Sequence, residues 1–324
     1  MREILLRIVL PVVIACIAMS GGMAAEPYPA KPIRMISLLP PGPDAFIRVI
    51  ATRLAEQIGQ PVVVENRVGG SGVPAAQAVM NAPADGYTLL FYTVVLIISK
   101  SIQPNLVFDP VADFAPVAKI YGGGASLLLV RPDAPFKSAQ ELIDRARAAP
   151  GKITHGGVYG LSGHLNAASF LALAGAKGFH VPFKATGDDL PAILRGDIDF
   201  TFQASTVAMP QVQGGKFRVL AATSGERMRV FPDVPTAKEI LKNDLMVQDN
   251  WSGFAVHAKT PPAIIRRLHA ETGRLLQDAA VRKVLEASGN QVSGEETSEQ
   301  FGQFMRREFD KWREIVKLTG VKVE

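Results

Sequence analysis

Short apolar runs alternate with segments in which apolar residues recur every three or four positions along most of this chain. The runs at residues 33–39, 62–64 and 87–92 predict strands. The segment 45–58 and the alanine-rich stretch from Gly72 to about residue 80 predict helices. This order of strand, helix, strand, helix and strand predicts a mainly parallel sheet with helices on both faces.

The alternation continues through the rest of the sequence. Further strands are predicted at 126–130, 198–202, 217–223 and 251–257, and helices at about 138–148, at 190–194, after Thr260-Pro261-Pro262, and from Thr297 to just before Gly320. Asp188 and Asp189 are expected to cap the helix that follows them. We therefore expect an α/β protein of two connected lobes, the chain crossing near residue 125 and returning near 250. Lobe 1 would comprise residues 26–125 and 251–324, and lobe 2 residues 126–250.

The first 25 residues have the three parts of a secretory signal peptide. Arg2 and Arg7 give a basic start, residues 8–18 an apolar core, and residues 22–25 small side chains for cleavage. The predicted location is therefore the periplasm. A retained membrane anchor is one alternative. The other is a lipoprotein, because the residues that end in Cys16 resemble a lipobox. Cys16 is the only cysteine, so a chain cleaved at residue 25 has no disulfide.

Charge and histidine spacing narrow the possible functions. The formal charge of +5 falls to +4 once the predicted signal, with two Arg and one Glu, is removed. Lys and Arg are scattered, so no nucleic-acid partner is expected. The five histidines, at positions 155, 164, 180, 257 and 269, show no metal-binding spacing, and no metal or other cofactor is expected.

Three predicted strand-to-helix loops are rich in glycine and small residues: 40–44, 69–72 and 155–164. Such loops expose backbone N–H groups, and the start of the following helix adds a favourable dipole for an anion. For each loop alone, a tight structural turn is an alternative explanation. The three together predict a cleft that binds a carboxylate without Lys or Arg.

Two of these loops also carry loose enzyme motifs. Residues 70–75 fit the pattern Gly-x-Gly-x-x-Ala of dinucleotide-binding folds, although Pro74 is awkward at that position. Residues 160–164 come within one residue of a hydrolase nucleophile elbow with Ser162 at its centre, and Asp197, Asp199 and His257 are candidate triad partners. A secreted hydrolase that uses Ser162 is therefore an alternative function.

Several blocks in order resemble the periplasmic receptors of tripartite tricarboxylate transporters, the Bug receptor family. They are residues 28–34, 63–72 (Val-Val-Glu-Asn-Arg-Val-Gly-Gly-Ser-Gly), 84–90, 108–117, 180–184, 196–199 and 231–236 (Phe-Pro-Asp-Val-Pro-Thr). The resemblance implies a two-lobed periplasmic-binding-protein fold, type II-like, that closes on a small carboxylate. It implies delivery of an unchanged ligand to an integral-membrane permease, and no enzymatic activity. A monomer is expected.

The resemblance also carries over candidate ligand-binding residues. In the first loop they are Pro41, Gly42 and Asp44, and in the loop of lobe 2 they are Tyr159, Gly160 and Ser162. Further candidates are Thr93, Val158, His164, Thr186 and Gln203.

Three departures from the family pattern bear on the ligand. The first loop is two residues shorter and contains Pro43, which has no N–H; residues 92–98 are nearly all apolar; and Val158 replaces a glycine. We therefore expect a tighter, more apolar pocket, suited to an aromatic or otherwise apolar carboxylate more than to citrate. A ligand-sensing receptor no longer coupled to transport is a further alternative.

Overall fold

The computed structural model describes residues 28–41, 44–69, 72–287 and 290–322. The predicted signal peptide and Cys16 lie outside the described residues. The chain divides into a first unit, Met1–Ala30, and a second, Lys31–Glu324, to which all the elements below belong. Among the described residues, no helix is both long enough and apolar enough to cross a membrane.

We use the name lobe 1 for the six-stranded sheet and the helices that pack on it. The strand order of this sheet is β11-β4-β10-β3-β1-β2. Its strands are β1 (Ile33–Ser37), β2 (Val62–Asn66), β3 (Thr88–Thr93), β4 (Phe114–Gly124), β10 (Asn250–His257) and β11 (Gln291–Val292). β1 is parallel to both β2 and β3, whereas β10 is antiparallel to β3 and β4. The sheet is therefore mixed, which corrects the expectation of mainly parallel sheets. β4 leaves lobe 1 and β10 returns to it, so these neighbours must run in opposite directions.

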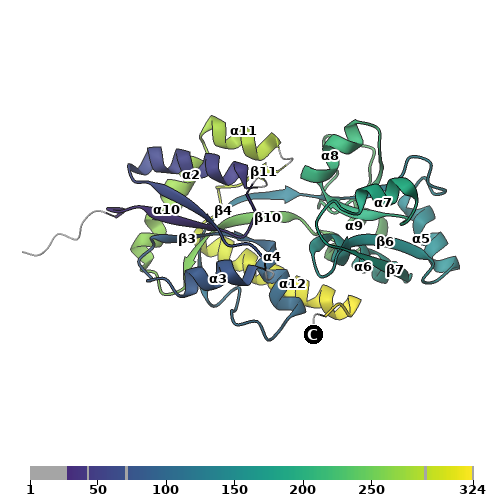
Figure 1. The fold of residues 1–324 in the computed structure, drawn as a ribbon, viewed down its shortest axis with the longest axis horizontal. Helices are drawn as coiled ribbons and strands as arrows, with labels where there is room; N and C mark the ends of the chain where they lie inside the picture. Colours follow the sequence, from purple (N-terminus) through teal and green to yellow (C-terminus); the bar gives the residue numbers. More distant parts are fainter. Residues whose placement is uncertain (1–27, 42–43, 70–71, 288–289, 323–324) are drawn as a thin grey trace, which may run out of the picture. The chain divides into compact units, whose positions relative to one another are not determined.

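Two groups of helices cover this sheet (Figure 1). One group is α2 (Ala45–Ile58), α10 (Pro262–Leu275) and α11 (Ala279–Ala287), and the other is α3 (Val73–Met80), α4 (Val94–Ile102) and α12 (Ser298–Thr319). Every residue of β3 is buried, and alternate residues serve opposite faces. Leu90 and Tyr92 belong to the core shared with α4 and α12, whereas Phe91 packs edge-on against Phe46 of α2.

Lobe 2 contains two smaller sheets. β5 (Ser126–Val130) lies between β8 (Thr201–Ala204) and β9 (Arg218–Ala222), antiparallel to both, and β6 (Ile153–Val158) is parallel to β7 (Gly178–Phe183). Its helices are α5 (Ala139–Ala148), α6 (Ser162–Leu173), α7 (Leu190–Arg195), α8 (Ser205–Gln213) and α9 (Ala237–Leu241), with a short 3-10 turn, Asp244–Met246.

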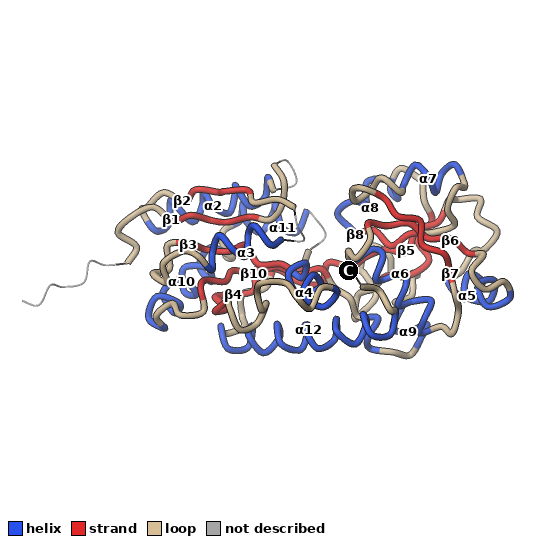
Figure 2. The backbone as a smooth tube through the Cα atoms, turned by 60° about the horizontal axis from the view of Figure 1, so that its bottom comes forward, coloured by secondary structure: helices blue, strands red, loops and turns tan. Residues whose placement is uncertain are grey.

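Two chain crossings and one long helix connect the lobes. β4 passes into β5 at Ala125, and the chain returns at Asn250, which lies opposite Gly124. In both views the helix α12 extends from the six-stranded sheet toward lobe 2 (Figure 2), where it packs against α6. Leu165 of α6 accordingly belongs to the hydrophobic core of lobe 1.

Most predicted elements are present within a few residues of their expected bounds. The helix predicted at 45–58 is α2, and α12 has the predicted capping box at Thr297 and Gln300 and a left-handed Gly320 at its end. β4 was not predicted, since Pro116 and three consecutive glycines interrupt its apolar pattern.

Candidate functional site

The first predicted loop is fastened to its own lobe by a buried carboxylate. Asp44 is fully buried, and its Oδ2 accepts a hydrogen bond of 2.8 Å from Nδ2 of Asn66 and pairs with Arg48 at 3.0 Å. The same Asn66 amide donates to the carbonyl of Leu39 at 2.8 Å. Asn66 of β2 therefore holds both ends of the loop, and Arg48 of α2 holds the end at Asp44. Pro41 is exposed, and Gly42 lies outside the described residues.

The second loop leads into α3, and its last residue, Gly72, packs against Leu96 of α4. Gly72 has a positive φ of 86°, and a Cβ added there would lie 2.7 Å from Cδ2 of Leu96. Glycine is therefore required at this position by both backbone conformation and close contact. Gly70 and Ser71 lie outside the described residues, so the dinucleotide motif is not described in full.

Thr93 and the apolar run after it have a structural explanation. The Thr93 hydroxyl accepts a hydrogen bond of 3.3 Å from the amide of Val95 and so caps α4. Leu96, Ile97 and Ile98 are buried in the core that α4 shares with α12. The apolar run at 92–98 is thus a strand end and the start of a core helix, and its role as an apolar pocket wall stays a prediction.

The third loop, called the 157–161 loop here, comprises the last two residues of β6 and the connection to α6 in lobe 2. The amide of Leu161 donates to the carbonyl of Val158 at 3.1 Å, and the amide of Gly160 donates to Nδ1 of His164 at 3.1 Å. The Gly160 amide therefore has a partner within the protein. α6 begins at Ser162 with Leu161 as its N-cap, without a side-chain cap and without an acidic residue in its first turn. The first N–H groups of a helix lack partners in the helix itself and lie at the positive end of its dipole, so the start of α6 is of the kind that suits an anion.

Tyr159 extends from this loop to the end of the chain. Its ring is about half exposed, and its hydroxyl donates a hydrogen bond of 2.9 Å to the carbonyl of Lys322. Val158 is partly buried. Thr186 is exposed in the turn between β7 and α7.

Gln203 is held by the buried carboxylate of Asp189, which was predicted to cap the helix that follows it. Nε2 of Gln203 donates to Oδ1 of Asp189 at 2.6 Å, and the hydroxyl of Thr201 donates to Oδ2 of Asp189 at 2.5 Å. Asp189 makes no side-chain capping bond to α7, which corrects the capping prediction. Burial raises the pKa of Asp189, opposed by these two hydrogen bonds.

His164 belongs to a stack of three histidines beneath the 157–161 loop. Its ring centroid lies 3.7 Å from that of His180 and 5.9 Å from that of His155. Burial lowers the pKa of His155 and His164 to about 3 and also lowers the pKa of His180. No group of three or more His, Cys, Asp or Glu among the described residues is arranged to hold a metal ion.

The hydrolase constellation is not assembled. Asp199 accepts hydrogen bonds from the amide and hydroxyl of Thr154, and Asp197 pairs with Arg195. Nδ1 of His257 accepts from the amide of Lys259. Each proposed partner of Ser162 is therefore engaged in its own local structure.

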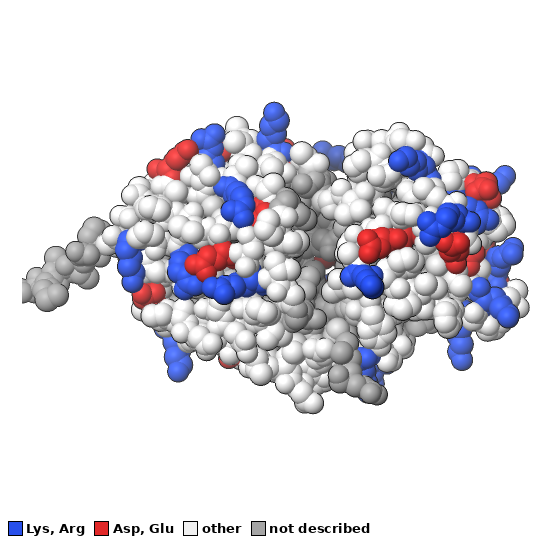
Figure 3. All heavy atoms as spheres, viewed as in Figure 1, with Lys and Arg blue, Asp and Glu red and all other residues white. Residues whose placement is uncertain are grey.

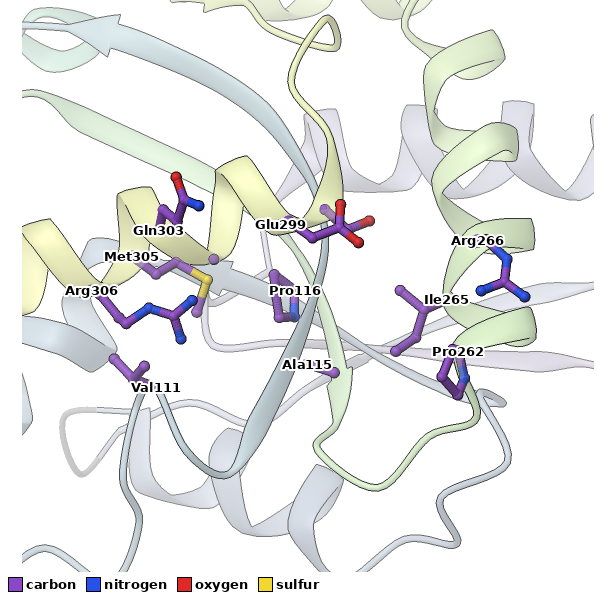
Figure 4. A pocket seen from close by; sticks show the side chains of 12 residues that line it. Val111, Ala115, Pro116, Pro262, Ile265, Arg266, Glu299, Gln303, Met305 and Arg306 are labelled. Atoms are coloured by element: carbon purple, nitrogen blue, oxygen red, sulfur yellow. The ribbon is translucent and has the colours of Figure 1, made fainter.

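A cavity of about 520 Å³ lies elsewhere, between α10 and α12. Ala115 and Pro116 lie between Arg306 and Arg266 on its opposite sides (Figure 4). None of the sequence-predicted site residues lines it. On the face drawn in Figure 3, Lys and Arg are interspersed with Asp and Glu rather than gathered in one patch.

The fold is that of the periplasmic solute-binding proteins. Rpa4515 of R. palustris, solved with adipate, superimposes with a TM-score of 0.77 at 27% identity over 91% of this chain and 99% of its own. MatC (Rpa3494) from Rhodopseudomonas palustris, solved with bound malate, gives a TM-score of 0.74 at 27% identity, over 89% and 100% of the two chains.

The sequence comparison identifies the family within this class. Residues 46–321 match the tripartite tricarboxylate transporter family receptor, and Protein BugT of Bordetella pertussis is 31% identical over 98% of both chains. This chain belongs to that receptor family. It is a solute-binding receptor of a tripartite tricarboxylate transporter and not an enzyme, which rules out the hydrolase alternative.

The sequence alone did not indicate several residues that build these loops. Arg48 and Asn66 hold Asp44, and His155 and His180 complete the stack on His164. Asn66 lies in the family block 63–72, and His180 begins the block 180–184. The sequence motifs therefore included both residues but did not indicate which side chains they contact.

Proposed function

We propose that this chain captures a small carboxylate in the periplasm, between the 40–44 loop of lobe 1 and the 157–161 loop of lobe 2, and presents it to an integral-membrane permease. The observation that carries the proposal is the uncapped start of α6 behind a glycine-containing loop. α4, α5 and α12 each have a side chain that accepts a hydrogen bond from the first turn. α2, which follows the 40–44 loop, has no such cap, and α3, α7, α8 and α10 also lack one, so it is the glycine-containing loop before α6 that favours this helix start. An unoccupied helix start suits a ligand carboxylate, which would accept N–H groups and lie at the positive end of the dipole.

The class of ligand is supported by the relatives. Rpa4515 was solved with adipate and MatC with malate. We propose a carboxylate of this size for the present chain. The expectation of an aromatic ligand is supported mainly by Val158 and by the short first loop. Residues 94–98 support it less, since they lie in α4, where Leu96, Ile97 and Ile98 are part of the core.

A thermal-shift experiment tests the proposal with adipate, malate, citrate and benzoate as probes. A ligand at about 100 times its dissociation constant stabilises a protein by about 2.7 kcal/mol, which gives a readable rise in melting temperature. We expect a rise with at least one aliphatic acid. A rise with benzoate alone would favour the apolar pocket, and no rise with any probe would contradict the carboxylate proposal.

A pair of substitutions at the first residue of α6 isolates the amide. Ser162→Ala removes the hydroxyl and keeps the N–H, whereas Ser162→Pro also removes the N–H at the one helical position where proline is well tolerated. We expect Ser162→Pro to weaken binding of the responding probe at least tenfold more than Ser162→Ala. Equal affinities in the two variants would count against a role for this amide.

A further inference from the structure

Three histidines from three consecutive elements meet beneath the 157–161 loop. His155 of β6 and His180 of β7 are directly opposed in the parallel register of the two strands, with ring centroids 5.2 Å apart. His164 comes from α6, the crossover helix between these strands, and stacks on His180 at 3.7 Å with an angle of 20° between the rings. The three rings therefore form one cluster that spans the whole β6–α6–β7 unit.

Two of these rings hold the ends of the loop. Nε2 of His180 donates to the carbonyl of Gly157 at 3.0 Å, which fixes its tautomer because a carbonyl oxygen can only accept. Nδ1 of His164 accepts the N–H of Gly160 at 3.1 Å, and it can do so only while that nitrogen carries no proton. Gly157 packs closely on the start of α6: its φ is 139°, and a Cβ there would lie 3.0 Å from the amide nitrogen of His164.

The surroundings of the cluster favour uncharged rings. Tyr159 packs on His164 and His180 with centroids at 5.0 and 5.9 Å, and Phe200 packs on His155 at 5.6 Å. Two carboxylates lie beside this strand: Asp189 accepts hydrogen bonds from Thr201 and Gln203, and Asp199 accepts them from Thr154. Neither bonds to an imidazole in the hydrogen bonds of the described residues. No described acidic side chain makes an ion pair with any of the three rings.

We propose that this histidine stack is a proton-sensitive clamp, with His164 as the residue that positions the 157–161 loop for the ligand, and that acid releases the loop. The inference deepens the proposed function, because this loop is the one proposed to bind the carboxylate. When the clamp opens, the rings reach water and bind protons at ordinary pH, whereas in the closed form His155 and His164 have a pKa of about 3. Proton binding therefore favours the open form.

The size of the effect follows from linkage. A histidine that recovers its ordinary pKa of about 6.5 on opening raises the open population about tenfold between pH 7.5 and pH 5.5. His155 and His164 together give about 100-fold. His180 is more exposed and adds a smaller factor in the same direction.

Native-state hydrogen exchange on the ligand-free protein tests the clamp. The protection of a peptide that covers the 157–161 loop is measured at pH 7.5 and 5.5 and corrected for the chemical exchange rate at each pH. We expect protection in this peptide to fall about 100-fold. A peptide over β3 of lobe 1 serves as an internal control and should change less than about threefold. A parallel loss in both peptides, or no loss in the loop, would overturn the proposal.

A matched variant separates the proton from the hydrogen bond. In His164→Asn the side-chain oxygen replaces Nδ1 as the acceptor for Gly160, but it does not titrate. We expect protection at pH 7.5 to stay within a few-fold of the parent and the acid-induced fall to shrink to about tenfold. His257→Asn, outside the stack, should leave the 100-fold fall unchanged. A fall in His164→Asn as steep as in the parent would contradict the clamp.

The two proposals fail separately. The exchange experiment contains no ligand, so its result does not depend on whether a carboxylate binds. If protection of the loop does not change with pH but adipate raises the melting temperature, the clamp is wrong and the receptor site stands. If protection falls in acid but no carboxylate raises the melting temperature, the clamp stands and the proposed ligand is wrong.

Discussion

The hydroxyl of Tyr159 in lobe 2 lies 2.9 Å from the carbonyl oxygen of Lys322, to which it donates a hydrogen bond. Lys322 follows α12, which belongs to lobe 1, so this contact joins the proposed ligand loop to the last segment of the other lobe. The 157–161 loop is thus held by hydrogen bonds to His164 and His180 and by a hydrogen bond to the end of the chain.

Tyr159→Phe should remove this link at small cost. We expect a loss of ~0.5–1 kcal/mol in the free energy of unfolding, since the hydroxyl is partly exposed and water replaces its partner. Chemical denaturation measures the loss. Truncation after Val321 removes the acceptor, and Tyr159→Phe in the truncated chain should then cost nothing more. Additive losses would show that the hydroxyl has another partner.

Asp44→Ala should destabilise lobe 1 by ~1–3 kcal/mol, because it removes the buried carboxylate that accepts from Asn66 and pairs with Arg48, and leaves these two groups only Leu39 and each other as partners. Asp44→Asn should cost less, since it keeps an acceptor for Asn66. Asp133→Ala is the matched control: that carboxylate is 82% exposed and pairs with Arg131, and its loss should change stability by less than about 0.5 kcal/mol. Equal effects at the two sites would refute a fastening role for Asp44.

Gly163→Ala and Gly273→Ala should act in opposite directions. Both glycines lie in helices, but a Cβ at Gly163 would meet the carbonyl oxygen of Phe202 at 2.7 Å, whereas nothing lies within 4 Å of one at Gly273. We expect Gly163→Ala to cost ~1–3 kcal/mol and Gly273→Ala to gain ~0.5–1 kcal/mol. Melting temperatures that move together would contradict the close contact of α6 with β8.

Asp249 should make the protein less stable as pH rises through the mildly acidic range. Burial raises the pKa of Asp249 to about 6, only partly offset by the nearby charge of Lys311. Because the folded form holds this proton more tightly than the unfolded form, stability is highest below about pH 4 for this group and falls until about pH 6. Asp249→Asn should remove that fall, so the variant gains ~1–3 kcal/mol at pH 7 and nothing at pH 4. An equal gain at both pH values would argue against ionisation as the cause.

Local sequence signals predicted most single elements of this fold. Apolar periodicity marked α2, the capping box marked the start of α12, and Gly320 marked its end, because each signal acts within a few residues. Where the signal was mixed the prediction failed. β4 contains Pro116 and residues 122–124, all glycine, and is a strand only because β10 pairs with it from more than 120 residues away.

The amino-acid sequence was enough to predict the class of receptor and the glycine-containing loops that lead into helices, since these depend on local periodicity and on an ordered set of short motifs. The tertiary structure alone decided which partner each loop residue has. The Asp44 carboxylate holds Asn66, Asp189 holds Gln203 rather than its helix, and three histidines scattered over 26 positions form one stack. Hydrogen bonds and ring contacts between distant elements depend on strand register and helix packing, and those are fixed only when the whole core assembles.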